Sequence, residues 1–345
     1  MDALEKLRAI SEKHCLDGAI AEAMTDTAAL LGNGLEALER ALSDGFPDAP
    51  GGVREACRYV LDAGGKRIRP AICLLAFRAA RGAPDALPID LATACELLHN
   101  ATLLHDDVID EGDVRRGRPA VRVVFGNAVS ILGGDYLLMR CVETVAAAGP
   151  GFMPQFVATL RRLVEGEVTQ LELRGSLATT REQYFHIVEG KTASLFRWAA
   201  FSGALSAGAG EELCAALGDF GWHVGVAFQL VDDVLDFSAE PDALGKSLHT
   251  DIREGKMTLP LITAAASNPA LRGALAEMIS GAEPGALALR IAKEVRLAGA
   301  LEAAHGEAAD HTARAIEALR RTGAGDGKVI GSLCALAEAL LCREM

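Results

Sequence analysis

The sequence predicts an all-α protein folded as one large helical bundle. Half of its 345 residues are apolar, only 5% are aromatic, and 36 are glycine. This composition favours closely packed helices over β-sandwiches, which are rich in aromatic and β-branched residues. Apolar residues recur every three or four positions, the helical period, and no stretch alternates convincingly between apolar and polar residues.

Each expected helix is an apolar-periodic run bounded by glycine, proline or a polar turn. In chain order, these helices are expected at 20–43, 51–63, 70–81, 88–110, 119–147, 152–174, 180–207, 211–237, 258–267, 271–281, 284–298, 300–321 and 326–343. The chain has no fixed-period repeat, no low-complexity tract and no interdomain linker. We therefore expect one domain over residues 25–345, preceded by a loosely attached extension at 1–24.

Charge and cysteine pattern exclude several classes of protein. A net charge of −13 argues against a broad nucleic-acid-binding surface. The eight cysteines form no CxxC pair and mostly lie in apolar helical patterns, which favours buried free thiols over disulfides or zinc. The charged N-terminus lacks an apolar signal-peptide core, and no run reaches the ~20 apolar residues of a membrane span. We expect a soluble, cytoplasmic protein.

Two acidic motifs follow the pattern D-D-x-x-D with apolar residues at the x positions. They are LLHDDVID, with Asp106, Asp107 and Asp110, and FQLVDDVLDF, with Asp232, Asp233 and Asp236. On a helix, positions i and i+4 share one face about 6 Å apart, so the first and last aspartates of each motif point together. A solvated acidic surface does not account for two copies in matching apolar frames.

Paired carboxylates on two facing helices suit a hard cation. Magnesium prefers oxygen ligands, keeps several waters and is commonly completed by substrate phosphates. Basic residues support a phosphate ligand: GGKRIRP places Lys66, Arg67 and Arg69 beside a helix N-terminus, which favours anions. Arg115 and Arg116 follow the first acidic motif. Surface solubility is the alternative for each basic cluster taken alone.

Three other patterns suggest different chemistry. The segment Gly190-Lys191-Thr192 resembles the end of a P-loop, but Phe185 stands where that motif needs glycine and no strand precedes it. Two Glu-x-x-His pairs, at Glu96 and Glu302, have the spacing of di-iron bundles but lack two further inward glutamates. His105 adjoins Asp106 and is expected to support the site or lie in the core rather than bind metal.

Five segments occur in the order and spacing of a known family: GGKRIRP, HNATLLHDDVIDEGDVRRG, GKTASLF, FQLVDDVLDF and GKMTLP. Over about residues 25–340 the chain thereby resembles the trans-polyprenyl diphosphate synthases, whose all-α isoprenoid synthase fold surrounds a central cavity. The resemblance implies head-to-tail condensation. An allylic diphosphate ionises, the double bond of isopentenyl diphosphate attacks the cation, and a proton is lost. It also implies three Mg²⁺ ions per active site and a homodimer.

The resemblance assigns roles residue by residue. The metal ligands would be Asp106, Asp110, Asp232 and Asp236. The catalytic residues would be Asp106, Asp107, Asp110, Arg115, Lys191, Asp232, Asp233 and Lys246. The allylic diphosphate would be bound by Arg115, Lys191, Thr192, Gln229, Lys246 and Lys256. Isopentenyl diphosphate would be bound by Lys66, Arg69, His99 and Arg116.

The sequence departs from the family pattern at one place and leaves two rival functions. His249 precedes Asp251 where the family usually has glycine, so the shape of this closing loop is open. A class I terpene cyclase shares the D-D-x-x-D motif, but it does not need a pocket for isopentenyl diphosphate. A non-catalytic subunit of a heteromeric synthase does not need intact aspartates in both motifs.

Product length is expected to depend on residues one helical turn before Asp106. Ala101 and Thr102 occupy this level, where short-chain members of the family typically carry aromatic side chains. Leu137, Leu138, Cys141 and Val145 offer a possible lower wall without aromatic residues. Small residues leave the tunnel open at this depth, so we expect a long-chain product. The family resemblance implies a range of about C30–C50, the length of quinone side chains. The alternatives are close helix packing at Ala101 and a short-chain product.

Overall fold

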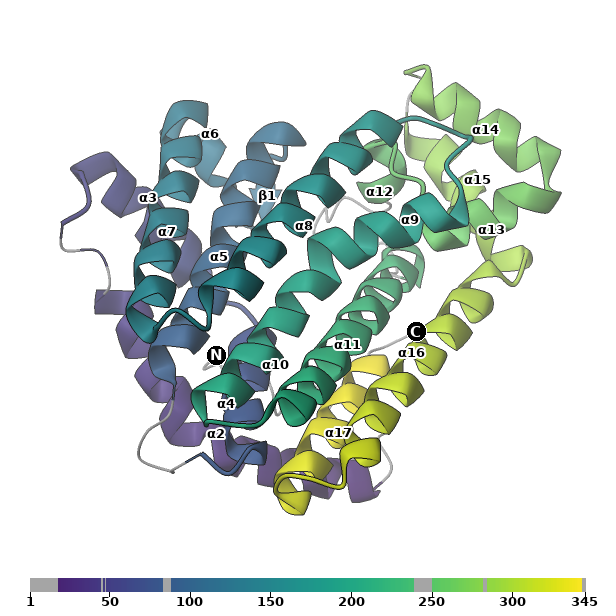
Figure 1. Cartoon of the computed structure of the whole chain (residues 1–345). Coiled ribbons are helices and arrows are strands. Elements are labelled where there is room, and N and C mark those ends of the chain that lie inside the picture. The colour runs from purple at the N-terminus through teal and green to yellow at the C-terminus, as the bar shows by residue number, and fades with distance from the viewer. Residues whose placement is uncertain are drawn as a thin grey trace.

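A computed structural model of the chain describes residues 18–44, 46, 48–82, 88–238, 250–281 and 284–342. It confirms an all-α architecture, in which long helices lie side by side (Figure 1). The first helices are α2 (Gly18–Asp44), α3 (Gly51–Asp62), α4 (Ile68–Ala79), α5 (Ile89–Ile109), α6 (Val121–Phe125), α7 (Asn127–Ala148) and α8 (Met153–Leu173). A π-helix, η1 (Glu189–Ala193), joins α9 (Arg181–Val188) to α10 (Ser194–Ser206).

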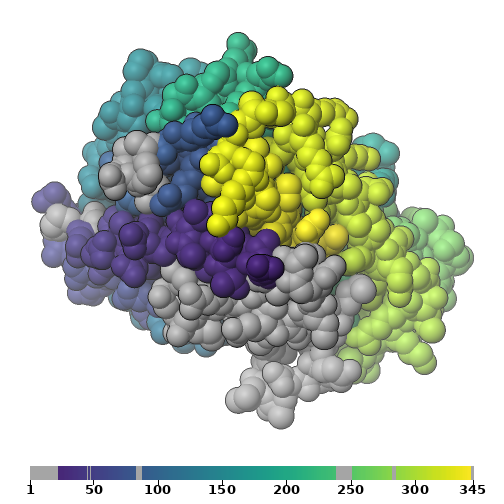
Figure 2. Space-filling view, turned by 90° about the horizontal axis from the view of Figure 1, so that it is seen from below, coloured from purple at the N-terminus to yellow at the C-terminus, as the bar shows by residue number. Residues whose placement is uncertain are grey.

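The remaining helices complete the bundle and a smaller group at one end of it (Figure 1). They are α11 (Glu211–Ser238), α12 (Thr250–Arg253), α13 (Leu259–Ser267), α14 (Pro269–Ile279), α15 (Pro284–Leu297), α16 (Ala300–Thr322) and α17 (Gly327–Leu341). Figure 2 shows α2 lying against α17, so the first and last described helices pack together. No helix among the described residues has the length and apolar character needed to cross a membrane.

The structure differs from the expected helices at four places, one of which is the short helix α12, formed between the helices expected at 211–237 and 258–267. The helix expected at 119–147 is broken at Gly126, whose φ of 86° lies in the left-handed region that glycine adopts readily. The helix expected at 180–207 contains the π-helical segment η1. A two-residue antiparallel ladder, β1 (Val114–Arg115) with β2 (Arg118–Pro119), forms where only a loop was expected.

The first helix begins before the expected domain boundary. Residues 1–17 lie outside the described residues, and α2 starts at Gly18 and runs across position 24. Met24 is only 2% exposed within the core. Of the cysteines, Cys15 lies outside the described residues. Those within them are free thiols, most of them buried, as expected.

Two hydrophobic cores meet along α11. One core joins α2–α5, α7, α8, α10 and α17, and includes Val224 of α11. The other joins α9 and α13–α16, and includes Val226 and Leu230 of α11. Because α11 packs against both α10 and α16, it holds the second acidic motif at a fixed place, with most of the apolar residues of that motif in the smaller core.

Candidate active site

A cavity of about 480 Å³ lies between the end of α5 and the middle of the bundle. Its walls carry most of the residues that the sequence singles out: Arg69, His99, Thr102, Asp106, Arg115, Arg116, Lys191, Thr192, Gln229, Asp232, Asp233 and Lys256. Gln170, Arg174, Tyr184 and Asp251 also line it. The structure therefore brings both acidic motifs and the basic residues to one site.

The first acidic motif lies at the end of α5, where basic side chains meet it. Asp110 ends the helix, and its backbone N–H donates to the Asp106 carbonyl at 2.8 Å. The Asp110 carboxylate accepts hydrogen bonds from Arg174 and, at 2.9 Å, from Lys256. Lys191 Nζ lies 3.9 Å from Asp106 Oδ2. The protein's own cations thus neutralise these carboxylates.

Burial and these cations set the proton affinity of the two carboxyl groups in opposite directions. Burial raises the pKa of Asp106 to about 6; Lys191 opposes the shift, and Glu167 and Asp110 add to it. Burial would also raise the pKa of Asp110, but Lys256 and Arg174 outweigh it and lower that pKa. Asp106 is therefore the carboxylate that most lacks compensating positive charge.

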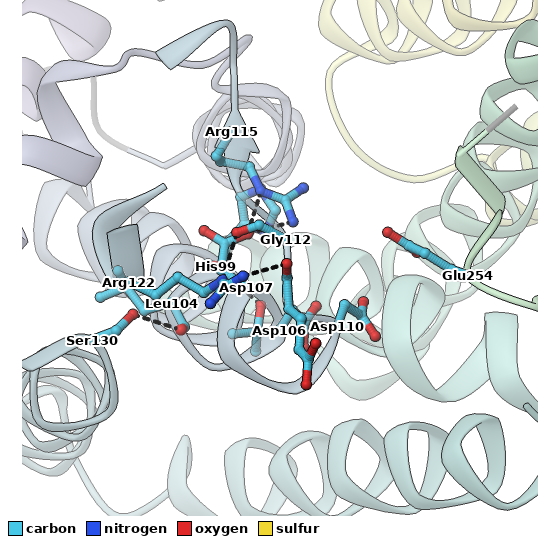
Figure 3. A network of polar contacts seen from close by, with 12 residues as sticks. His99, Leu104, Asp106, Asp107, Asp110, Gly112, Arg115, Arg122, Ser130 and Glu254 are labelled. Atoms are coloured by element: carbon cyan, nitrogen blue, oxygen red, sulfur yellow. Dashed lines mark hydrogen bonds and ion pairs between the residues drawn. The ribbon is translucent and has the colours of Figure 1, made fainter. Parts of the chain in front are cut away.

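Asp107 points away from the cavity and fixes the β1–β2 hairpin. Its carboxylate is 1% exposed and accepts hydrogen bonds from Arg115, with Nε at 2.8 Å (Figure 3). The hairpin turn has left-handed backbone at Arg116 and Gly117, with φ of 53° and 75°. This turn aims Arg116 at the Gly64 carbonyl, to which it donates a hydrogen bond. Asp107 therefore positions both arginines rather than facing a metal.

The second motif is built on α11. Asp232 and Asp233 line the cavity, and Asp233 is held by Tyr184 Oη at 2.5 Å and Gln229 Nε2 at 2.9 Å. Thr192 Oγ1 in turn donates to Gln229 Oε1 at 2.9 Å. Burial raises the pKa of Asp233 although both hydrogen bonds act to lower it. Asp233 thus anchors the motif, leaving Asp232 to face the cavity.

The segment η1 places Lys191 and Thr192 on the wall. At Gly190, an added Cβ would lie 2.6 Å from the Arg162 carbonyl oxygen and 2.9 Å from Gly166 Cα. Two glycines are therefore needed for α8 and η1 to approach this closely. π-helical turns are rare and often occur at functional sites. Here the turn brings Lys191 to Glu167 and Asp106, with which it forms ion pairs.

Two arginines of the GGKRIRP segment have different roles: Arg69 lines the cavity, and Arg67 forms ion pairs away from it. Arg69 is half-buried with its guanidinium carbon 4.6 Å from the Phe196 ring centroid, and desolvation lowers its pKa to about 10. Burial, with Arg69 nearby, also holds the pKa of His99 well below its usual value, so its imidazole is neutral. Arg67 instead pairs with Glu39 at 2.8 Å and Glu96 at 2.6 Å.

The structure leaves the di-iron alternative without support. Glu96 is occupied by Arg67, and His305 Nε2 lies 3.3 Å from the Leu341 carbonyl oxygen. His105 faces α7, with Nε2 3.1 Å from the Ile131 carbonyl oxygen.

Some expected site residues do not line the cavity. Lys66 is exposed, and Asp110 and Asp236 lie at its edge rather than on its wall. Lys246 and His249 lie outside the described residues. Thr102 is on the wall, whereas Ala101 is 2% exposed and does not reach it. Leu137, Cys141 and Val145 are fully buried in the core, and Leu138 is half-buried against it.

Sequence reasoning missed the residues that α8 contributes. Glu167, Gln170 and Arg174 follow one another at i, i+3 and i+7, so they share one face of the helix. This row of polar residues at helical spacing is the signal by which the sequence could have identified these three residues. Tyr184 and Asp251 carry no comparable pattern, because their place at the site depends on the packing of distant elements.

The donor set fits magnesium completed by a phosphate ligand. Carboxylate oxygens from α5 and α11 are the ligand type that Mg²⁺ prefers. Among the described residues, no three acidic, histidine or cysteine side chains converge as a preformed metal site. Arg69 Nε, Gln170 Nε2 and Glu167 Oε1 are buried there without a hydrogen-bond partner. Since buried polar atoms are normally hydrogen-bonded, these atoms suit a polar ligand.

Comparison with known proteins identifies the family of the chain. The family model described as polyprenyl synthetase matches residues 51–293. An all-trans-nonaprenyl-diphosphate synthase (geranyl-diphosphate specific) of Rhodobacter capsulatus is 36% identical over 298 residues, 85% of this chain and 90% of that protein. A short chain isoprenyl diphosphate synthase of Methanothermobacter thermautotrophicus is 34% identical over 317 residues, covering 90% and 95% of the two chains.

A solved structure has the same architecture. The crystal structure of a polyprenyl synthase from Caulobacter crescentus CB15, complexed with calcium and isoprenyl diphosphate, has a TM-score of 0.86 at 34% identity. The match covers 92% of this chain and 97% of that chain. The chain therefore belongs to the polyprenyl synthetase family and has the all-α isoprenoid synthase fold expected from its motifs.

Proposed function

We propose that the protein is a Mg²⁺-dependent prenyltransferase that condenses isopentenyl diphosphate onto an allylic diphosphate. One observation carries the proposal: aspartates from both motifs and six basic side chains line a single cavity. The basic side chains are Arg69, Arg115, Arg116, Arg174, Lys191 and Lys256. Two diphosphates bring far more negative charge than one such cavity could bind without these groups and metal.

The residues divide between the two substrates. Lys191 and Lys256 lie beside the first acidic motif and would bind the allylic diphosphate. Arg69, Arg116 and the neutral His99 line the same cavity and would bind isopentenyl diphosphate. Both charge-assisted and neutral hydrogen bonds are thus available, and charge-assisted bonds are about twice as strong.

The chemistry needs charge stabilisation rather than a protein base. The allylic C–O bond breaks with its electron pair going to the diphosphate. The double bond of isopentenyl diphosphate then forms the new C–C bond, and the released diphosphate accepts the proton. Magnesium, when bound, would neutralise the charge of the departing diphosphate. Lys191 and Lys256, beside the first acidic motif, would add positive charge that stabilises the same departing group. The binding of three Mg²⁺ ions in each active site stays a prediction.

We propose a long-chain product. Thr102 is the side chain at the depth where a bulky residue would stop the chain, and it is small. The nonaprenyl-forming relative supports this length, whereas the short-chain relative at similar identity keeps the alternative open to test.

A product assay tests the function directly. Incubation with isopentenyl and farnesyl diphosphates and Mg²⁺ should give longer all-trans diphosphates, separated by chromatography. A cyclic hydrocarbon would instead indicate a terpene cyclase, and no product would indicate a non-catalytic subunit. Asp106→Ala and Asp232→Ala should each lower turnover by several orders of magnitude, because charge stabilisation is usually the largest catalytic contribution.

We also propose a homodimer formed through one apolar face. Most of the exposed large hydrophobic side chains among the described residues fall between positions 109 and 171. They lie on the end of α5, on β1 and on α6, α7 and α8, and Val114 of β1 and Val164 of α8 are 67% and 63% exposed. We call this face the α6–α8 face. Contiguous exposed apolar surface marks interaction sites, and twofold dimers are the commonest oligomers. A cytoplasmic location also stays a prediction.

A further inference from the structure

Arg174 occupies a carboxylate that the proposed function assigns to metal. It is the residue at which α8 ends, and its guanidinium lines the cavity and donates to Asp110 Oδ1. No sequence motif includes it. Among the described residues, Asp110 is the carboxylate with which Arg174 forms an ion pair. The Asp110 side chain is 7% exposed, whereas that of Arg174 is 32% exposed, so the guanidinium is open to the cavity side of the contact.

Two turns are joined so that Arg174 and Lys256 reach the same carboxylate. The Gly175 N–H donates to the Gly255 carbonyl oxygen at 2.8 Å. Both glycines have left-handed backbone, with φ of 75° and 70°, and a Cβ added at Gly255 would lie 3.2 Å from Gly175 N. The residues next to this backbone contact, Arg174 and Lys256, converge on Asp110. Lys256 has a second carboxylate, Glu254 at 2.5 Å, to which it can return.

Both oxygens of the Asp110 carboxylate accept hydrogen bonds from cationic side chains, Oδ1 from Arg174 and Oδ2 from Lys256. Lys256 is shared with Glu254, whereas Asp110 is the carboxylate that pairs with Arg174 among the described residues. A divalent cation at Asp110 would therefore meet a like charge at each oxygen. Metal can therefore bind Asp110 well only when Arg174 and Lys256 have moved to an anion. A diphosphate in the cavity is such an anion.

We propose that Arg174 is a diphosphate-binding residue that occupies Asp110 until a diphosphate draws it away. Arg174 thereby couples the two ligands: the carboxylate becomes available to metal when the guanidinium turns to the phosphate. Because coupling between two ligands is reciprocal, metal also strengthens diphosphate binding. The inference rests on the proposed function for the identity of the ligands, but its test measures binding rather than product.

The test is Mn²⁺ binding followed by electron paramagnetic resonance, with and without inorganic diphosphate. For the wild type we expect weak Mn²⁺ binding that diphosphate strengthens. Arg174→Gln should bind Mn²⁺ alone about tenfold more tightly, since one charge-assisted competitor is gone. Diphosphate should then strengthen its Mn²⁺ binding less than in the wild type. Arg174→Lys keeps the charge and should stay close to the wild type.

Arg253→Gln is the matched control. Arg253 is exposed on α12, close in sequence to Lys256, and its substitution removes the same charge. It should leave Mn²⁺ affinity and the effect of diphosphate unchanged. Thermal unfolding of each variant checks that the fold is intact. Equal Mn²⁺ affinities in Arg174→Gln, Arg253→Gln and the wild type, without diphosphate, would overturn the inference. A failed product assay with normal coupling would instead overturn only the proposed function.

Discussion

At the scale of single residues, the site contains charged side chains that destabilise the folded protein and that a bound ligand would neutralise. Asp106 is buried and compensated by Lys191 at 3.9 Å, a longer contact than the 2.9 Å between Lys256 and Asp110. Isolated buried carboxylates are unfavourable, and proteins tolerate them mainly where function requires them. Asp106 should therefore lower stability while being essential for turnover.

Asp106→Asn should stabilise the protein above pH 6 when metal is chelated. Because the pKa of Asp106 is raised from 3.8 to about 6, the folded state binds more protons than the unfolded state between these values. Wild-type stability therefore falls as pH rises through this window, by on the order of 2 kcal/mol, and the asparagine variant avoids that loss. Urea unfolding at pH 4 and pH 7.5 measures the difference in unfolding free energy between the wild type and the Asp106→Asn variant.

The matched control is Asp310→Asn, which removes an exposed aspartate from α16. It should not reproduce the pH-dependent gain. If Asp106→Asn shifted stability equally at both pH values, burial would not be the cause.

Product length should respond to Thr102 in particular. Its side chain lines the cavity, so Thr102→Phe places a ring in the path of the growing chain. We expect the product distribution to shift to shorter chains while the first condensation proceeds, as shown by chromatography. Ala101→Phe should act in the same direction, but it also overpacks a buried position, which typically costs about 1–3 kcal/mol. A wild-type distribution ending at farnesyl or geranylgeranyl length would refute the long-chain proposal.

At the scale of elements, the π-helical turn η1 determines where Lys191 lies. The turn is flanked by ordinary helix on both sides, and Gly166 and Gly190 let α8 approach it closely. The hairpin β1–β2 likewise determines where Arg115 and Arg116 lie. Irregular backbone thus supplies Lys191, Arg115 and Arg116, whereas regular helices supply the aspartates of both motifs and Arg69.

Gly190→Ala should disturb both stability and turnover. The added Cβ would contact backbone atoms of Arg162 and Gly166, which cannot move aside as a flexible side chain could. We expect a loss of about 1–3 kcal/mol in unfolding free energy, together with a lower turnover as Lys191 shifts. Gly273→Ala on α14 is the control, because its Cβ would meet no atom within 4 Å. There, alanine should stabilise the helix by up to about 1 kcal/mol.

Regular elements were predictable from the sequence, and irregular ones were not. The period of apolar residues located α5 and α11 within about one residue at each end, and the D-D-x-x-D spacing located Asp106 and Asp232 on the cavity. The break at Gly126 and the π-turn at Gly190 were missed, because glycine in an apolar helical pattern does not reveal its backbone angles. Arg174 was missed because its partner, Asp110, lies 64 positions away.

At the scale of the whole molecule, the α6–α8 face predicts how two copies meet. Val164→Asp places a charge in the middle of this face, where the wild-type side chain is 63% exposed. We expect sedimentation to show a dimer for the wild type and a shift towards monomer for this variant, because a buried unpaired charge is strongly unfavourable. Leu297→Asp, at a 71% exposed position on α15, should remain dimeric. A monomeric wild type would refute the homodimer.

The division of the interior along α11 has a consequence for hydrogen exchange. The buried side chains described for α14 and α15 belong to the smaller core, whereas α10 is enclosed between α4 and α11. Contiguous cooperative units open at different free energies, and those with fewer buried contacts open first. Amide protons of α14 and α15 should therefore exchange with solvent well before those of α10. Asp251 and Lys256 lie on the side of the cavity that borders the faster-exchanging unit. Local opening of that unit would therefore expose this side of the cavity to solvent while α5 remains folded.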